Sequence, residues 1–166
     1  SLRENKVMSL KTRFGNLGNI LDFDNLTKED IYVLDSPILT NSQFSKFCKI
    51  FSKKIKIIDC TFEITSSLKD RIETIKTECE TAVREGSSTL ILSDKNISNK
   101  RASIPSILSV GAVHSHLVRN SLRGYCSLNV ECADALDTHS FAVLIGVGAT
   151  TINPYLALDS IYQRYE

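Results

Sequence analysis

The polar residues best placed for chemistry follow the apolar runs that predict β-strands. In parallel α/β proteins, ligands and catalytic groups gather where strands end and the next loops begin. Those positions hold Asp59 to Thr61, Ser93-Asp94, Glu131 and Asn153. Neighbouring carboxylates push each other's pKa values apart, which suits general acid and base catalysis. Asp94 and Glu131 are therefore the candidate cofactor-binding residues, as polar anchors for a flavin or a phosphate ligand.

These residue types also have a structural explanation at the ends of strands. Aspartate, serine and asparagine accept hydrogen bonds from the free N–H groups of helix N-termini and turns. We favour this explanation, and Asn153 before Pro154 is predicted to cap the last helix. No catalytic residue is assigned.

The spacing of the histidines argues against a metal or catalytic site. His114 and His116 are two positions apart, so on a helix their side chains diverge by about 200° and cannot bind one ion as an i, i+4 pair does. Asp137, His139 and Ser140 have the composition of a catalytic triad. However, adjacent helical side chains diverge, and triads combine residues from separate loops. We predict neither a metal site nor a triad.

The cysteines and glycines match no cofactor motif. The five cysteines contain no C-x-x-C pair, so no zinc, iron–sulfur or disulfide pattern is indicated. They are Cys48, Cys60, Cys79, Cys126 and Cys132. The run from Gly146 to Gly148 lacks the third glycine of a dinucleotide fingerprint and follows a predicted helix. P-loop and nucleophile-elbow motifs are missing from the sequence as well.

Length and composition describe an ordinary globular domain. The chain has 166 residues, of which 42% are hydrophobic and 23% charged, with a net charge of +1. This size predicts one domain, and the charge balance gives no global field for nucleic acid or anionic membranes. No apolar run approaches the roughly 20 residues that span a bilayer. The first residues show no signal peptide, and we expect the chain to be cut from a longer protein.

Residues 1–55 are predicted to form an irregular lead-in followed by one amphipathic helix. Residues 1–35 show no sustained periodicity. Thr40-x-x-Gln43 is a capping box, and Phe44, Phe47 and Phe51 recur at helical spacing after it. Lysines occupy the other faces, at Lys46, Lys49, Lys53 and Lys54. Such a segment could bind RNA, but any docked amphipathic helix has this pattern, and we favour that explanation.

Residues 56–166 alternate between strand and helix patterns. Strands are predicted at residues 56–60, 89–93, 127–131 and 150–152. Helices are predicted from Ser66 to Glu85, from Ser103 to about Arg123, from Asp137 to Gly148 and from Asn153 to Tyr162. The strand starts are about 30 residues apart, as in βαβ units. The fold class is therefore α/β with repeated βα units and a parallel sheet, either a small open sheet or, as we prefer, a half or incomplete (β/α) barrel.

Several segments resemble the central domain of the large (alpha) subunit of glutamate synthase. They fall in that family's order and spacing and extend over essentially all 166 residues. The longest run from Ile104 to Arg119 and from His139 to Ala149. The others are residues 2–4, 7–10, 36–40, 92–94, 126–131 and 153–157.

The resemblance implies that the chain is part of a multidomain oxidoreductase. Glutamate synthase releases ammonia from glutamine in an amidotransferase domain, passes it through a tunnel, and adds it reductively to 2-oxoglutarate at an FMN domain beside a 3Fe-4S cluster. Electrons come from NAD(P)H, through a small reductase subunit in bacteria, or from ferredoxin. The central domain joins the catalytic domains and is related in topology to the FMN-binding barrel. The expected location is the cytoplasm or the plastid stroma.

The resemblance carries no catalytic or cofactor residue onto this chain. The family's N-terminal nucleophilic cysteine, FMN-binding barrel and cluster cysteines have no counterpart here. We therefore expect an interdomain scaffold that is inactive alone, binds no cofactor of its own, and contacts the amidotransferase and FMN domains of its own polypeptide. The alternatives are a half-barrel that binds a ligand or flavin through Asp94 and Glu131, and an RNA-binding module.

Overall fold

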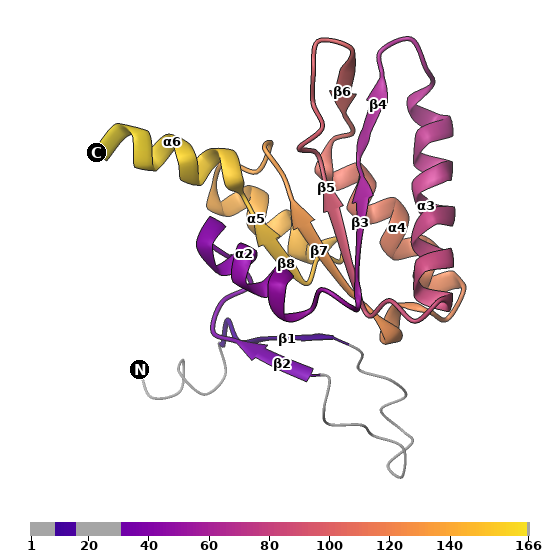
Figure 1. The fold of residues 1–166 in the computed structure, drawn as a ribbon, viewed down its shortest axis with the longest axis horizontal. Coiled ribbons are helices and arrows are strands. Elements are labelled where there is room, and N and C mark those ends of the chain that lie inside the picture. The colour runs from indigo at the N-terminus through magenta and orange to yellow at the C-terminus, as the bar shows by residue number, and fades with distance from the viewer. Residues whose placement is uncertain (1–8, 16–30, 166) are drawn as a thin grey trace.

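The computed structural model describes residues 9–15 and 31–165, with a parallel sheet at its centre (Figure 1). Its strands are β1 (Thr12–Gly15), β2 (Ile31–Leu34), β3 (Ile55–Asp59), β4 (Thr61–Glu63), β5 (Thr89–Ser93), β6 (Arg101–Ser103), β7 (Ser127–Glu131) and β8 (Thr151–Asn153). Its helices are α2 (Asn41–Ile50), α3 (Leu68–Arg84), α4 (Ser106–Arg119), the 3₁₀ turn η2 (Arg123–Tyr125), α5 (Thr138–Gly146) and α6 (Tyr155–Tyr165). Among these, no helix is long and apolar enough to cross a membrane.

The predicted parallel sheet is confirmed. Its strand order is β3-β5-β7-β8, and β5 pairs in parallel with β3 on one side and β7 on the other. Each step along the chain from β3 to β8 moves one strand across the sheet through an intervening helix. This α/β arrangement is compatible with a partial (β/α) barrel.

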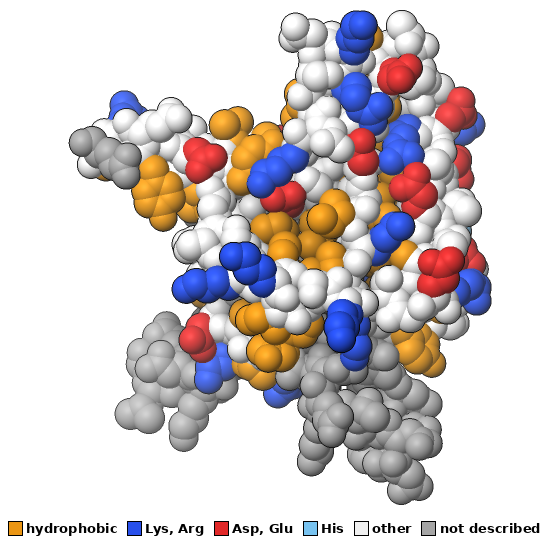
Figure 2. All heavy atoms as spheres, viewed as in Figure 1, with side chains coloured by type: hydrophobic (Ala, Val, Ile, Leu, Met, Phe, Trp, Pro, Cys, Tyr) orange, Lys and Arg blue, Asp and Glu red, His pale blue; other side chains and the backbone are white. Residues whose placement is uncertain are grey.

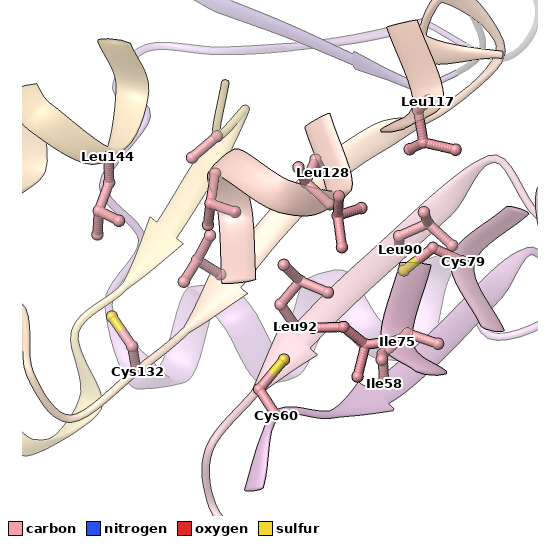
Figure 3. Packing of buried hydrophobic residues seen from close by; sticks show 14 of the residues in the cluster. Ile58, Cys60, Ile75, Cys79, Leu90, Leu92, Leu117, Leu128, Cys132 and Leu144 are labelled. Atoms are coloured by element: carbon pink, nitrogen blue, oxygen red, sulfur yellow. The ribbon is translucent and has the colours of Figure 1, made fainter. Parts of the chain in front are cut away.

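Alternation along β5 divides the core between the two faces of the sheet. Leu90 and Leu92 pack with α3, α4 and α5 in the larger hydrophobic cluster, whose close packing is seen in Figure 3. Ile91 points to the other face and packs with Phe44 and Phe47 of α2. All five β5 side chains are buried, as expected of a parallel strand covered on both faces.

The segment before α2 closes one edge of the sheet. Ile38 forms a parallel bridge with Ile152 of β8. The Leu39 N–H donates to the Ile152 carbonyl, and the Ile152 N–H donates to the Pro37 carbonyl, both at 2.8 Å. Helix α2 then leads the chain from the β8 side of the sheet to β3. The later connections cross the sheet in the opposite direction, from β3 to β8. A right-handed connection from the β8 side to β3 places α2 on the face opposite α3 and α4, as observed.

The predicted helix starts are largely confirmed by their caps. Thr40 forms both halves of a capping box with Gln43. The Ser67 hydroxyl accepts a hydrogen bond from the Asp70 N–H, and Asp137 does the same for Ser140. These local side-chain bonds explain why the sequence located the helices well.

The predicted irregular lead-in is wrong for the residues that the structure describes there. β1 and β2 form an antiparallel pair with Thr12 opposite Leu34. Residues 31–34 are an Ile-Tyr-Val-Leu run with high strand propensity. Both strands are only four residues long, so the sequence does not reveal the pairing. Residues 1–8 and 16–30 of the predicted lead-in lie outside the described residues.

The region after β3 also differs from the prediction. Strands β4 and β6 pair antiparallel and extend beyond the end of the main sheet (Figure 1). Ser103, predicted to begin a helix, instead ends β6, and α4 begins at Ser106. Helix α4 ends at Arg119 rather than near Arg123, because the chain turns there with Ser121 at φ 58°. Short edge pairs of this kind leave little periodicity to detect.

A half-buried arginine links the segment after α4 to the turn before β8. Arg123 donates to the Cys126 carbonyl at 2.7 Å, to the Gly148 carbonyl at 2.8 Å, and to Nδ1 of His114 at 3.2 Å. Gly148 has φ +121°, and a Cβ atom there would lie 2.3 Å from Nδ1 of His114. Burial and the Arg123 charge lower the pKa of His114, so this imidazole is neutral at pH 7. Gly148 is required both by backbone conformation and by space.

Gly148→Ala should destabilise the protein by about 2–4 kcal/mol, because left-handed strain adds to the steric conflict with His114. Gly111→Ala in α4 is the matched control. A Cβ there meets nothing within 4 Å, so it should stabilise the helix by about 0.5–1 kcal/mol. Urea unfolding of both variants measures the difference. Equal midpoints for the two would contradict the packing at Gly148.

Candidate functional site

The polar residues that end the strands lie next to one another at the carboxyl ends of the parallel sheet, as the sequence predicted. Ser93 is in register with Asp59 on one side and Glu131 on the other, and Glu131 is in register with Asn153. Asp94 immediately follows β5. This strand-end cluster (Asp59, Ser93, Asp94, Glu131 and Asn153) occupies the position where parallel α/β proteins bind ligands.

Glu131 is held by two partners within the chain. Its Oε2 accepts a hydrogen bond from the Ser93 hydroxyl at 2.6 Å, and its Oε1 forms an ion pair with Nζ of Lys95 at 2.7 Å. The residue is only 8% exposed. Nζ of Lys95 also lies 5.1 Å from the centre of the Tyr155 ring, within cation–π range. Both carboxylate oxygens of Glu131 are therefore already engaged.

Asp94 is more deeply buried, at 4% exposure. Its Oδ2 accepts the Ala133 N–H at 2.9 Å, which fixes the loop after β7. Burial raises the pKa of Asp94 against the opposing effects of the Ala133 and Tyr155 hydrogen bonds, and the nearby Asp134 charge raises it further. Burial and the carboxylate of Asp94 likewise raise the pKa of the Tyr155 hydroxyl. Two carboxylates with different environments thus lie side by side, but both are engaged in holding loops.

Asp59 forms an ion pair that anchors the β4–β6 extension. Arg101 donates to Oδ2 of Asp59 and to the Thr61 hydroxyl, each at 2.9 Å. Burial would raise the pKa of Asp59, but hydrogen bonds from Thr61 and Asn96, together with the Arg101 charge, lower it overall. Asp59 is therefore an ionised structural partner. Arg101 was missed from the sequence, because nothing local links it to a residue 42 positions away.

Asn153 does not have the predicted role toward the last helix. It is the final residue of β8, and its Nδ2 donates to the Leu39 carbonyl at 3.0 Å and to Oδ1 of Asn41 at 2.9 Å. Nδ2 of Asn41 in turn donates to Asp159 at 2.7 Å. Asn153 therefore ties the start of α2 to the sheet, and Asn41 links that start to α6.

The histidines and the triad-like residues serve separate structural contacts. His114 contacts Arg123, while Nε2 of His116 lies 2.6 Å from Oε2 of Glu80 on α3. The Asp137 carboxylate accepts from both the N–H and the hydroxyl of Ser140, each at 2.7 Å, as a helix cap. Within the part of the chain that the structure describes, no three His, Cys, Asp or Glu side chains are grouped to hold a metal.

The thiols are unsuited to nucleophilic or cluster chemistry. All five cysteines are free, and four are buried. Burial raises the pKa of Cys126 to about 11 and those of Cys60 and Cys132 to about 12. A thiolate is the reactive form and the metal-binding form, so these residues behave as small apolar side chains.

The strand-end cluster does not fit a flavin phosphate or a similar anion. The α4 N-terminus already holds a carboxylate, since Asp134 accepts from the N–H and the hydroxyl of Ser106 at 2.9 and 2.7 Å. Asp137 occupies the α5 N-terminus. Asp94 and Glu131 add negative charge beside them. A cavity of about 440 Å³ lies instead at the opposite end of the sheet, lined by Val83, Arg84, Gly86, Ser87, Leu122 and Tyr125.

At pH 7, Glu131→Gln should lower stability and Asp94→Asn should not. Because the folded-state pKa of Asp94 is raised, its protonated form stabilises the fold below about pH 3.8, and that contribution is lost as the pH rises through the folded-state pKa. Asp94→Asn should thus equal or exceed the parent stability at pH 7. Glu131→Gln should cost about 1–2 kcal/mol through its weakened Lys95 and Ser93 contacts.

Chemical unfolding of both variants at pH 7 and pH 4.5 measures these changes. The advantage of Asp94→Asn should shrink toward the lower pH, since a raised pKa brings protonation of the parent Asp94 closer as the pH falls. A loss of stability in Asp94→Asn at pH 7 would contradict the described environment of that carboxyl group.

Comparison with known proteins finds relatives among the glutamate synthases. Over 168 residues the chain is 50% identical to the glutamate synthase [NADPH] large chain of Azospirillum brasilense, covering 99% of this chain and 11% of that protein. It is 38% identical to the chloroplastic ferredoxin-dependent glutamate synthase of Spinacia oleracea, covering 98% of this chain and 10% of that protein. It is 35% identical to the glutamate synthase [NADH] of Schizosaccharomyces pombe, covering 96% of this chain and 8% of that protein.

The chain thus spans about a tenth of the length of these relatives. The family described as glutamate synthase central domain matches residues 1–166. The chain belongs to the glutamate synthase central domain family.

Proposed function

We propose that this chain is the connecting domain of a glutamate synthase. It joins the glutamine amidotransferase domain to the FMN synthase domain and supports the passage of ammonia between them. The observation that carries the proposal is that every side chain of the strand-end cluster makes at least one bond that fixes a loop, strand or helix end of the same chain, although Oδ1 of Asp94 has no hydrogen-bond partner among the described residues. Ser93 and Lys95 hold Glu131, Ala133 binds Asp94, and Arg101 pairs with Asp59.

The names of the relatives support a role that is independent of the electron donor. They specify NADPH, ferredoxin and NADH for proteins that all contain a stretch similar to this chain. A domain common to enzymes with three donors serves a step that they share. Glutamine hydrolysis, ammonia transfer and glutamate formation are the shared steps of the proposed enzyme.

We assign the cofactors of the proposed parent enzyme to its other domains. FMN and a 3Fe-4S cluster would be held by domains outside these 166 residues, since the strand-end cluster does not fit a phosphate and four of the five cysteines are buried thiols. The partners are the amidotransferase and FMN domains of the same polypeptide, with a reductase subunit or ferredoxin reaching the parent enzyme. A cytoplasmic or plastid location accords with this role.

Neither alternative function is favoured by the geometry. A flavin site at Asp94 and Glu131 would place two carboxylates near the flavin phosphate. An RNA surface on α2 would need exposed rings for base stacking, but Phe44 and Phe47 are buried and lie 5.9 Å apart in the core.

The Asp94→Asn, Glu131→Gln double variant of the full-length enzyme distinguishes a scaffold role of this domain from a catalytic role. The scaffold proposal expects glutamine-dependent and ammonia-dependent glutamate formation to remain within about twofold of the parent, because removed catalytic groups cost about 100-fold or more. Steady-state rates with each nitrogen source provide the measurement. A 100-fold loss with both sources in a folded enzyme would instead identify a catalytic site in this domain.

Loosening the domain should uncouple the two half-reactions. In the full-length enzyme, Gly148→Ala should make glutamine hydrolysis exceed 2-oxoglutarate consumption, since ammonia escapes when the connection is less rigid. Gly111→Ala should keep the two equal. Simultaneous assay of both substrates gives the ratio. If hydrolysis and consumption fall together in Gly148→Ala, the domain supports folding of the enzyme but not ammonia transfer.

A further inference from the structure

Among the residues that the structure describes, no strand pairs with β3 on the side away from β5. The Lys54 carbonyl and the Cys60 N–H bond to β5, at 3.1 and 2.7 Å. Along a parallel strand the main-chain groups of alternate residues face the same side, so those of Lys56 and Ile58 also face β5. The N–H and C=O groups of Ile55 and Ile57 therefore face outward.

Only one outward group on this edge has a partner within the described part of the chain. The Asp59 carbonyl accepts a hydrogen bond from Arg71 of α3 at 2.6 Å. No partner is found there for the outward groups of Ile57. A row of free main-chain groups on an edge strand is a template for another strand.

The side chains beside this edge are also incompletely covered. Ile57 is 60% exposed and points to the α2 face of the sheet. Figure 2, in the same view as Figure 1, shows an apolar area on that face over β3 and β5, bordered by charged side chains. On the other face, a groove of about 340 Å³ runs between β3 and α3 and is lined by Lys56, Thr74, Thr77, Glu78, Thr81, Ala82 and Glu85.

The opposite edge of the sheet is already in use. Pro37 to Leu39 pair with β8 there, so β8 cannot accept a further neighbour. Of the four strands of the sheet, only β3 can therefore accept a further strand.

We propose that β3 accepts an extended strand from the part of the long polypeptide outside these 166 residues. The strand pairs with the main-chain groups of Ile55 and Ile57 and places an apolar side chain beside Ile57. The relatives are about ten times longer than this chain, which supplies the source. The inference rests on the proposed function as one domain of a larger enzyme.

A second copy of the chain is a poorer occupant of this edge. Two-fold antiparallel pairing centred on Ile57 would make the two Lys56 side chains diagonal neighbours on one face. Like charges in such positions destabilise a strand pair. A strand of different sequence has no such conflict.

Amide hydrogen exchange in the full-length enzyme, resolved to single residues of β3, tests the proposal. The Ile57 amide should exchange ~100-fold more slowly than an unprotected amide, because the added strand supplies its acceptor. The Ile58 amide, bonded to β5, is the internal control for a folded β3. Fast exchange at Ile57 with slow exchange at Ile58 would overturn the docked strand.

The Ile57→Asp variant tests the side-chain contact. A carboxylate beside the docked strand should release it, so that the Ile55 amide exchanges quickly while Ile58 stays protected. Continued protection of Ile55 would refute the apolar contact. Protection of Ile57 that disappears on tenfold dilution would identify a second copy and overturn the proposal.

The coupling ratio of glutamine hydrolysis to 2-oxoglutarate consumption is measured in the same preparation. Coupled turnover together with fast Ile57 exchange refutes the docked strand alone. Uncoupled turnover with a protected Ile57 refutes the proposed function alone.

Discussion

Strand β5 pairs with β3 on one side and with β7 on the other, and all five of its side chains are buried. The remaining elements follow from this arrangement. A strand buried on both faces requires cover from both, and the direction of each connection decides which helix provides it. Connections that run from β3 to β8 place α3, α4 and α5 on one face. The single return connection places α2 on the other.

The polar residues at the carboxyl ends of these strands hold the fold together. Each side chain of the strand-end cluster joins segments that are far apart in the sequence. Glu131 meets Ser93 across 38 positions, Asp59 meets Arg101 across 42, and Asn153 meets Asn41 across 112. Buried polar groups are costly unless they are paired, so each completed bond also specifies one arrangement of loops. The position where parallel α/β folds bind ligands here carries bonds that join distant parts of the chain.

The sequence predicted the elements whose signals are local. The capping box at Thr40, the cap at Ser67 and the apolar run of β5 each lie within a few residues, and the structure confirms them. The adjacency of Asp94 and Glu131 followed from the rule that parallel strands end at one edge. Pairing between distant short segments was not predicted, because β1 with β2 and β4 with β6 contribute three or four residues each. Arg101 and the amide bonds of Asn153 were missed for the same reason, since their partners are defined only by the folded sheet.

The parallel bridge between Ile38 and Ile152 spans 114 positions of the chain. During synthesis, β3, β5 and β7 can form with their helices as each leaves the ribosome, but the segment from Pro37 to Leu39 has no edge to join until β8 has emerged. Contacts of such high sequence separation form late and slow folding. The segment from Pro37 to Leu39, although translated before all four strands of the sheet, is therefore among the last to be fixed in place.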